Sequence, residues 1–416
     1  MSITYRNEIP YLEEQNLVEL TNSMQTPFYV YSQKNISDTF LKLKKSLNKD
    51  IYFAIKANSN QAIIALLNSL GAGADVVSHE EMQRALTAGV PPERIVFEGV
   101  GKSKSDISSA IDNNIRQINV ESIEELQLVN TIADSLNKKP RVGLRVNPDI
   151  NAETLDKIAT GKKTDKFGID FDQLYGACEI LKSLKNIKFA GLSCHIGSQI
   201  LQINIFERIF KKMKQAVKIF QSNNLPIDHL DLGGGFGIAY NNTQNQLDIN
   251  KLAMLIDDTY PNPSFKISCE PGRYLVASAG YLITKILTRK KNSNINFLIT
   301  DAGMQTLLRP AMYNACHRII PFNQKGNETT YTIAGPICES SDILAKDIKL
   351  PAQTKDNYLI ICDVGAYGSV MASNYNSKCL PAEVLVNQNK YAVIRHQEII
   401  EDVINRDKLP DWLKIT

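Results

Sequence analysis

The sequence lacks the features that mark exported, membrane-bound and nucleic-acid-binding proteins. No apolar run approaches the ~18 residues that a membrane-spanning helix needs. The N-terminal segment has no basic region followed by an apolar core, so we expect no secretory signal. The net charge of +3 is too small to favour nucleic acid or an anionic membrane surface. We therefore expect a cytoplasmic protein that binds neither nucleic acid nor a membrane.

Paired cysteines are also missing. The chain has seven cysteines, an odd number, and no two of them form a CxxC pair. They are Cys178, Cys194, Cys269, Cys316, Cys338, Cys362 and Cys379. In a chain without an export signal, this usage is typical of free thiols in a reducing cytosol. We expect no metal site.

What the sequence does contain is an alternation of short apolar runs and longer stretches of helical period. Between about residues 50 and 275 there are eight such runs, which are IYFAIKAN, GADVVS, RIVFEG, RQINVES, RVGLRVNP, KFAGLSCHIGS, IDHLDLGGG and FKISCEPG. Intervening segments such as SHEEMQRALTAG and SIEELQLVNTIADSLN open with a serine and acidic residues, as helix N-termini prefer. Eight strand–helix units predict an α/β fold, a (β/α)8 barrel of the TIM type.

The pattern changes after residue 275. Segments such as YLITKILTRKK and YLIICDVGAYG are strand-like and are separated by turns with little helix. The length of 416 residues allows two domains. We predict a barrel over residues 27–275 and an additional C-terminal all-β domain over residues 276–416, with residues 1–26 packed against the β domain.

The predicted barrel strands end in polar residues of functional types. They are Lys56, Asp75, Ser78, Arg145, Asn147, His195, Ser198, Gly233 to Gly237 and Glu270. In TIM barrels the chemistry lies at the C-terminal ends of the strands. Lys56 follows an apolar strand, where its amine can form a Schiff base with an aldehyde. The alternative is a lysine that extends from the strand end to solvent.

Three further motifs narrow the chemistry. The glycines of LDLGGGFGIAY expose backbone N–H groups that suit a phosphate, and the GxGxxG spacing of a dinucleotide fold is absent. Glu270 in CEPGRYL can bind a protonated pyridine nitrogen, and His195 in SCHIGSQ can stack on a planar ring. Taken singly, Glu270 has the alternative of a turn residue and His195 that of a core histidine. Together with Lys56 they specify pyridoxal 5'-phosphate.

With these motifs in this order, the chain resembles the diaminopimelate decarboxylase family, pyridoxal-phosphate enzymes with an alanine-racemase-type barrel and a β domain. The motifs that carry the resemblance are YFAIKAN, CHIGSQI, GGGFGI, EPGR, RPAMYNA, CESSD and GAYG. The resemblance implies that Lys56 holds the cofactor and that Cys338 donates a proton. The cofactor-binding residues expected with Lys56 are Asp75, His195, Ser198, Gly234, Gly235, Glu270, Pro271, Gly272, Arg273 and Tyr367. The substrate-binding residues that it implies are Arg273, Arg309, Tyr313, Glu339 and Tyr367. Small departures are Met312 and Cys316, where leucine and an aromatic residue are usual.

The resemblance implies decarboxylation of meso-2,6-diaminopimelate to L-lysine and CO2, the last step of bacterial lysine biosynthesis. It also implies a homodimer with shared active sites, in which Cys338 of one chain completes the site built on Lys56 of the other. Three alternatives stay open: decarboxylation of another basic amino acid, an isomerase of the racemase type, and a non-catalytic cofactor-handling barrel. The arginine of RPAMY and the glutamate of CESSD argue against the first of them.

Overall fold

Parallel strands in the middle of the chain close into a barrel. The computed structural model describes residues 3–151, 160–241 and 243–413. The barrel strands are β5 (Asp50–Ala54), β6 (Gly73–Val76), β7 (Ile95–Phe97), β8 (Gln117–Val120), β9 (Arg141–Asn147), β11 (Lys188–Ser193), β12 (His229–Asp231) and β13 (Lys266–Cys269). They are hydrogen-bonded in this order, and β13 pairs with β5 to close the ring. Each of the eight predicted apolar runs contains one of these strands, which confirms the (β/α)8 prediction.

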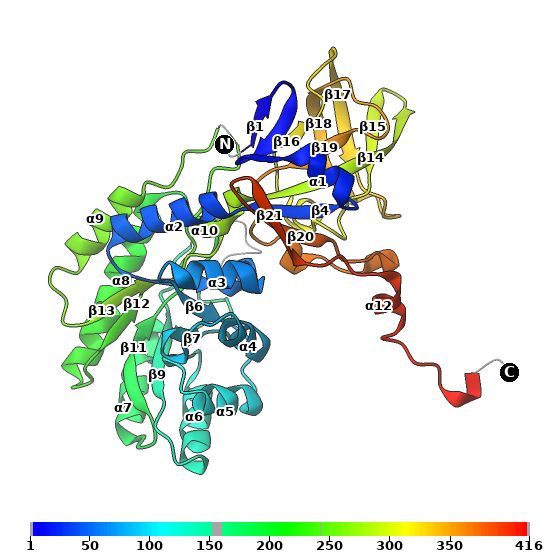
Figure 1. Ribbon diagram of the computed structural model, residues 1–416. Coiled ribbons are helices and arrows are strands. Elements are labelled where there is room, and N and C mark those ends of the chain that lie inside the picture. Colours follow the sequence, from blue (N-terminus) through cyan, green and yellow to red (C-terminus); the bar gives the residue numbers. More distant parts are fainter. Residues whose placement is uncertain (1–2, 152–159, 242, 414–416) are drawn as a thin grey trace. The chain divides into compact units, whose positions relative to one another are not determined.

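Helices alternate with the barrel strands along the chain (Figure 1). They are α2 (Gln33–Leu47), α3 (Gln61–Ser69), α4 (His79–Thr87), α5 (Lys104–Asp112), α6 (Ile123–Ser135), α7 (Leu174–Ser183), α8 (Ile203–Ser222), α9 (Ile249–Thr259) and α10 (Arg273–Val276). Shorter elements are the 3-10 turns η1 (Ile55–Ala57), η2 (Pro92–Arg94) and η4 (Phe171–Gln173) and the strand β10 (Ile169–Asp170), which pairs with β9. The serine caps are as predicted: the Ser78 and Ser122 side chains accept hydrogen bonds from Glu81 N and Glu125 N. One face of each helix is buried, as Phe206 and Phe210 are on α8.

A β-rich unit forms from both ends of the chain. The chain divides into a barrel unit, Ile36–Val276, and a β unit that combines Met1–Asn35 with Ala277–Thr416. The strands of the larger sheet of the β unit are β4 (Phe28–Ser32), β14 (Gly280–Asn292), β15 (Ile295–Thr300), β16 (Ile319–Pro321), β17 (Glu328–Ala334), β18 (Ile343–Pro351), β19 (Tyr358–Ile361), β20 (Ala382–Asn387) and β21 (Lys390–Arg395). The main path of this sheet runs β18-β17-β15-β14-β4-β20-β21, and β19 pairs with both β14 and β16. The predicted additional β domain is confirmed as a strand-rich part of the fold.

The strand β4 corrects the predicted start of the barrel at residue 27. It pairs antiparallel with β14 and parallel with β20, and all five of its residues are buried. A strand with hydrogen-bonded neighbours on both sides belongs to the sheet that contains them. The range predicted for the barrel therefore includes a strand of the β unit.

The N-terminal segment packs on the same unit. It contains the small antiparallel sheet of β1 (Ile3–Arg6), β2 (Ile9–Leu12) and β3 (Gln15–Asn16), followed by α1 (Leu17–Ser23). Leu12, Leu17 and Leu20 join a buried cluster with Ile283 of β14 and Ile360 of β19. Burial of these side chains anchors the segment, since each removes apolar surface from water.

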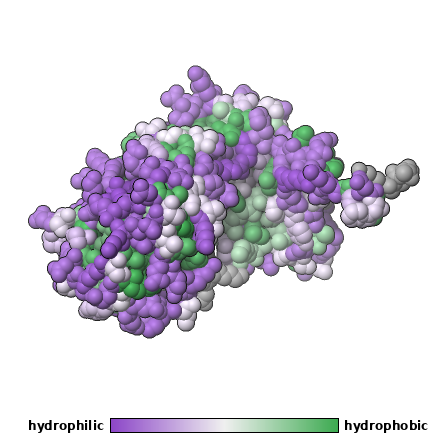
Figure 2. Space-filling model, turned by 90° about the horizontal axis from the view of Figure 1, so that it is seen from below, coloured by the Kyte–Doolittle hydropathy of each residue, from purple (hydrophilic) through white to green (hydrophobic). Residues whose placement is uncertain are grey.

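Helical structure in the β unit is short. It consists of α11 (Arg309–Tyr313) and α12 (Ile400–Ile404) with the 3-10 turns η5 (Ala277–Ala279), η6 (Ser369–Met371), η7 (Tyr375–Ser377) and η8 (Asp411–Leu413). No helix among the described residues is long and apolar enough to cross a membrane. Figure 2 shows hydrophilic residues over most of the face of the barrel unit that is nearest the viewer, with single hydrophobic residues between them.

Close strand packing at Gly191 gives a stability prediction. A Cβ atom at Gly191 of β11 would lie 1.7 Å from the His229 carbonyl oxygen of β12. Because two backbones would have to separate, we expect Gly191→Ala to lower the free energy of unfolding by about 3 kcal/mol or more. Urea denaturation followed by circular dichroism measures this change.

Gly176→Ala in α7 is the matched control. Nothing lies within 4 Å of a Cβ atom at this exposed helical position. Alanine should therefore stabilise the protein by roughly 0.5–1 kcal/mol through its helix propensity. Equal midpoints for the two variants would contradict the packing argument.

Candidate active site

The Lys56 side chain forms an ion pair at one end of the barrel. Lys56 lies in η1, directly after β5, and its Nζ is 2.6 Å from Oδ2 of Asp75 on the neighbouring strand β6. The Asp75 side chain is fully buried, whereas 31% of the Lys56 side chain is exposed. The alternative of a lysine that simply extends to solvent is not what the structure shows. A buried carboxylate holds this amine at the barrel mouth.

Glu270 follows β13 and is buried. Its Oε1 has no hydrogen-bond partner among the described residues. Burial raises the pKa of Glu270 well above its ordinary value, and the negative charges of Asp231, Asp75 and Glu98 raise it further. A carboxyl group in this state is suited to a ligand that brings a positive charge or an N–H donor.

His195 follows β11, and its ring is held as a neutral imidazole. The Gly234 N–H donates to Nδ1 of His195 at 3.2 Å. Desolvation and the positive charges of Lys56 and Arg145 lower the pKa of His195 well below its ordinary value. The ring proton of the neutral form is therefore on Nε2. A flat, uncharged ring in a fixed orientation can stack on a planar ligand.

The glycine run after β12 packs against two neighbouring strand ends. Cβ atoms at Gly233 and Gly234 would lie 2.0 Å from the carbonyl oxygens of Cys194 and Glu270, respectively. The Gly233 N–H donates to Asp231 Oδ1 at 2.7 Å, and the Gly234 N–H is used by His195. The glycines thus have a packing role that the sequence did not predict. Among the described residues the Gly235 N–H donates a hydrogen bond to no acceptor. This group can therefore donate to a ligand.

Arg273, the first residue of α10, lies beside Ser198. Its Nη2 and Nε donate to Ser198 Oγ at 3.0 and 3.3 Å, and its Nη1 donates to the Tyr240 hydroxyl at 2.8 Å. The guanidinium is buried. A buried cation next to the glycine run is suited to a phosphate. Tyr240 was not predicted as a site residue, although it ends the motif LDLGGGFGIAY.

The residues between Glu270 and Arg273 place the chain against η1. The Pro271 carbonyl accepts a hydrogen bond from Ala54 N at 3.3 Å. A Cβ atom at Gly272 would lie 2.9 Å from the Ala57 Cβ atom. These contacts bring the end of β13 close to the segment that carries Lys56.

A buried charged network lies at the C-terminal ends of β7, β8 and β9, and the sequence indicated only its arginine, Arg145. Nη1 of Arg145 is 2.8 Å from Glu121 Oε1 and 3.8 Å from Glu98 Oε2, and all three side chains are buried. Nη2 of Arg145 donates to the His195 carbonyl at 3.2 Å. Arg145 therefore helps to hold the backbone of His195 in place. Glu98 and Glu121 follow the strands β7 and β8 directly, so the strand-end rule was the signal that could have found them.

Two other residues from the predicted rim have structural roles. Ser78 caps α4 through its hydroxyl group. The amide of Asn147 donates to the carbonyls of Lys162 and Phe167 at 3.0 Å and so holds a loop. We assign neither Ser78 nor Asn147 a role in the chemistry of the site.

Arg309 in the β unit is the first residue of α11. It is 6% exposed, and its Nη1 is 2.9 Å from Nε2 of His317. Tyr313 is the last residue of the same short helix and is half-buried. Pro310 in the first turn favours helix at this point, and Asn314 ends it in a left-handed conformation with φ of 51°.

Cys338 and Glu339 lie in the turn between β17 and β18, and a second turn contacts them. The Asn376 amide donates to Cys338 Sγ at 3.2 Å, and the Tyr375 hydroxyl donates to Glu339 Oε1. Ser341 Oγ donates to Glu339 Oε2 at 2.9 Å. The hydrogen bonds from Tyr375 and Ser341 lower the pKa of Glu339, which keeps the carboxylate charged. Tyr375 and Asn376 were not predicted as site residues.

Tyr367 has a left-handed backbone with φ of 56°, which is rare for a bulky residue. It precedes Gly368, where a Cβ atom would lie 2.4 Å from the Val364 carbonyl oxygen. Strained conformations of this kind are concentrated at functional sites. The predicted site residues are divided between the two units, with Lys56 to Arg273 in the barrel unit and Arg309 to Tyr367 in the β unit.

Comparison with known proteins places this pair of units in a family. Residues 33–277 match the model of the pyridoxal-dependent decarboxylase, pyridoxal binding domain. The chain is 40% identical to a curated diaminopimelate decarboxylase of Aquifex aeolicus over 97% of this chain and 96% of that one. The chain belongs to the diaminopimelate decarboxylase family. It is therefore a pyridoxal-phosphate-dependent enzyme.

Solved structures agree with this assignment. The diaminopimelate decarboxylase of M. jannaschii in co-complex with L-lysine matches with a TM-score of 0.94 and 36% identity over 99% of both chains. The enzyme of Helicobacter pylori complexed with L-lysine matches with a TM-score of 0.89 and 40% identity, over 94% of this chain and 99% of that one.

The residues of the barrel unit fit pyridoxal phosphate. The unpartnered Glu270 Oε1 is a buried acceptor for a ring N–H group, and the Gly235 N–H and the buried Arg273 suit a phosphate. Lys56 offers a partly exposed amine on the same unit. These donors and acceptors are the set that an aldehyde, a pyridine nitrogen and a phosphate require.

The pKa of Glu98 leads to a prediction of pH dependence. Burial, with the nearby charges of Glu121 and Asp75, raises the pKa of Glu98 to about 7 in spite of Arg145. The folded protein therefore binds more protons than the unfolded chain between pH ~4.5 and ~7, so this group's contribution to stability falls as the pH rises through that window. We compare the free energy of unfolding of Glu98→Gln with that of the wild type. We expect this difference to favour the variant more at pH 8 than at pH 5, by on the order of 1–3 kcal/mol.

Denaturation curves of both proteins at pH 5, 6.5 and 8 test this expectation. Glutamine keeps the oxygen that accepts from the Asn119 amide, so this contact is retained while the charge is removed. Glu124→Gln, at an exposed position of α6, is the control and should show no such trend. A Glu98→Gln difference that is constant with pH would contradict the assignment.

Proposed function

We propose that this chain decarboxylates meso-2,6-diaminopimelate to L-lysine and CO2, the last step of lysine biosynthesis. Its relatives are named diaminopimelate decarboxylases, and two similar structures contain L-lysine. The observation that carries the proposal is the arrangement at the barrel mouth. The amine of Lys56 is held 2.6 Å from Asp75, and the barrel unit also contains the buried carboxyl group of Glu270 with an unpartnered oxygen.

When bound, pyridoxal phosphate supplies an aldehyde that combines with amines and a ring that accepts electrons. Lys56 would hold the aldehyde end, with Asp75 orienting the Lys56 amine. Glu270 would bind the ring nitrogen through Oε1, and His195 could stack on the ring as a neutral imidazole. Ser198, Gly235, Tyr367 and the segment from Pro271 to Arg273 would bind the phosphate, and Gly234 would support the same turn through its hydrogen bond to His195.

The distal end of the substrate carries both a carboxylate and an ammonium group. A guanidinium grips a carboxylate bidentately, which is the role we assign to Arg309, with Arg273, Tyr313 and Tyr367 as further contacts. Glu339 binds the ammonium, because Tyr375 and Ser341 keep its carboxylate charged. An amine that lacks the second carboxylate would not form this bidentate contact, so the site should reject it.

The product needs a proton on the carbon that loses CO2, and we assign the proton to Sγ of Cys338. Asn376 donates a hydrogen bond to this sulfur at 3.2 Å. Lys56 and water are lesser candidates for the donor.

An assay of CO2 release tests the proposed function. We expect release from meso-diaminopimelate and little from ornithine, arginine or lysine. Lys56→Ala should lower this activity by at least about a thousandfold, because it removes the amine that holds the cofactor. Lys49→Ala is the matched control, since Lys49 is another partly buried lysine, paired with Asp257 at 2.8 Å.

Each of the other outcomes of this assay indicates a different function for this chain. Release from another basic amino acid shows a decarboxylase of different specificity. Racemisation without CO2 shows an isomerase, and bound cofactor without turnover shows a cofactor-handling barrel. Any of these results contradicts the proposal.

We further propose a cytoplasmic homodimer with shared active sites. All seven cysteines are free thiols, which suits a reducing compartment. Lys56, which is assigned to the cofactor aldehyde, and Cys338, the assigned proton donor, belong to different units of the chain. In a shared site, Cys338 of one chain completes the site built on Lys56 of the other.

Complementation tests the shared site. Lys56→Ala and Cys338→Ala should each be nearly inactive. After the two variants are mixed and reassembled, one site of each heterodimer has lost both groups and the other is intact, so random pairing gives roughly a quarter of wild-type activity. A tagged pull-down establishes that subunits exchange. Heterodimers whose activity stays at the single-variant level would show that both residues act within one chain.

A further inference from the structure

We infer that His317 is a positioning residue for the substrate-binding Arg309. This inference rests on the proposed function, because it assigns His317 to holding the guanidinium that receives the distal carboxylate. Both side chains are 6% exposed, and Nη1 of Arg309 is 2.9 Å from Nε2 of His317. His317 itself touches no substrate in this role. It acts through Arg309.

The second ring nitrogen of His317 fixes the direction of the contact. Nδ1 of His317 is 3.0 Å from the carbonyl oxygen of Cys362. A carbonyl can only accept, so Nδ1 carries the proton and donates it. A guanidinium can only donate, so Nε2 presents its lone pair to Arg309. His317 therefore serves as a neutral bridge from a backbone carbonyl to the arginine.

The anchor of this bridge is part of the β-sheet. Cys362 directly follows β19 and is fully buried, and its N–H donates to the Arg318 carbonyl at 2.9 Å. The pair of β16 with β19 continues the same ladder from Ile319 and Ile361. His317 thus lies just before a paired segment. Because Nδ1 of His317 is bonded to the Cys362 carbonyl at that segment, its ring has a fixed anchor from which to hold Arg309.

The chain between the two residues brings them together. After α11, Asn314 takes a left-handed conformation with φ of 51° and Ala315 N donates to the Arg309 carbonyl at 3.4 Å. The chain therefore reverses and returns His317 to Arg309, eight residues later in the sequence. The guanidinium has five N–H groups, and the contact with His317 uses one of them. A bidentate grip on a carboxylate needs two others in a fixed plane.

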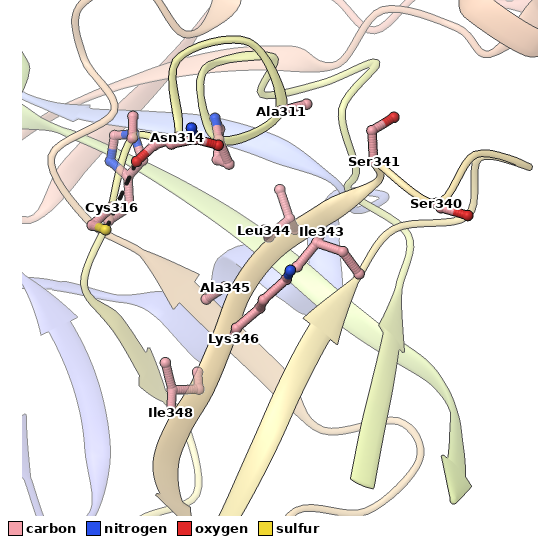
Figure 3. A pocket seen from close by; sticks show the side chains of 13 residues that line it. Ala311, Asn314, Cys316, Ser340, Ser341, Ile343, Leu344, Ala345, Lys346 and Ile348 are labelled. Atoms are coloured by element: carbon pink, nitrogen blue, oxygen red, sulfur yellow. Dashed lines mark hydrogen bonds between the residues drawn. The ribbon is translucent and has the colours of Figure 1, made fainter. Parts of the chain in front are cut away.

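A pocket beside His317 makes the bridge accessible to a chemical test. The pocket has a volume of about 440 Å³, and its lining includes His317, Asn314, Cys316, Ser341, Lys346 and Ile348. Figure 3 shows Leu344, Lys346 and Ile348 along β18, with Asn314 and Cys316 across the pocket from them. Imidazole is small enough for this space. It could enter the void left by truncation of His317.

The experiment measures the binding of L-lysine to the holoenzyme by titration calorimetry. L-lysine keeps one carboxylate of the substrate, and cadaverine, which has none, is the control ligand. We expect His317→Ala and His317→Phe to weaken L-lysine binding by roughly 10- to 100-fold, as for a lost hydrogen bond to a charged group. Cadaverine binding should change by less than about twofold. His317→Phe keeps most of the ring volume, so it tests the bridge if the alanine variant does not fold.

Kinetics and rescue separate positioning from a structural role. KM for meso-diaminopimelate should rise by the same roughly 10- to 100-fold, with kcat changed by less than about threefold. Imidazole should restore part of the L-lysine affinity to His317→Ala and none to Arg309→Ala. Cys316→Ala, which alters an exposed residue of the same pocket, is the matched control and should behave as wild type.

Wild-type L-lysine affinity in His317→Phe would overturn the inference, as would an equal loss of cadaverine binding. These results are distinct from failure of the proposed function. If the wild-type chain does not release CO2 from meso-diaminopimelate, the function itself is wrong. If it does and the His317→Phe variant binds L-lysine normally, only the role of His317 is wrong.

Discussion

The barrel unit depends on the burial of acidic side chains around very few cations. Asp75, Glu98, Glu121, Asp231 and Glu270 are all buried there. Arg145 lies against Glu121 and Glu98, and Lys56 lies against Asp75. Isolated charges are costly to bury, so the pKa of Asp231 rises to about 6, that of Glu98 rises to about 7 in spite of Arg145, and that of Glu270 rises well above its ordinary value. A barrel interior with this excess of carboxyl groups favours a ligand with a cationic ring nitrogen. It also holds a lysine amine at the barrel mouth.

The barrel was predictable because its strands are buried on both faces. Parallel strands of this kind appear in the sequence as continuous apolar runs, which is why all eight were found. Two of the strands that were missed, β18 and β4, have different reasons. The strand β18 alternates apolar residues with Lys346, Asp347 and Lys349 because it lies at the edge of its sheet, where charges prevent further pairing. The strand β4 is apolar, but its partners β14 and β20 follow it by hundreds of residues, and no local pattern reveals such pairing.

In the candidate site, too, some residues were predictable from the sequence and others were not. Lys56, His195 and Glu270 stand at strand ends with a motif around each, so residue type and position pointed to the same chemistry. Contacts between distant segments could not be predicted, because they depend on how loops meet. The amide of Asn376 reaches Cys338 across 38 positions, and the Tyr375 hydroxyl reaches Glu339 in the same way. The glycine run shows the reverse case, in which a residue pattern has a packing role in addition to the expected ligand role.

The β unit uses its sheet to hold loops in conformations that they would not adopt alone. Tyr367 and Asn376 both have positive φ, which suits asparagine and disfavours a bulky side chain. At Tyr367 such strain costs on the order of 1–3 kcal/mol and persists only where neighbouring contacts enforce it. Those contacts are present: Val364 N donates to the Gly280 carbonyl at 3.0 Å, and the Asn374 amide donates to Glu398 at 2.6 Å. An extensive sheet with rigid ladders is therefore what allows the turn between β17 and β18 to present the Cys338 thiol and the Glu339 carboxylate with defined orientations.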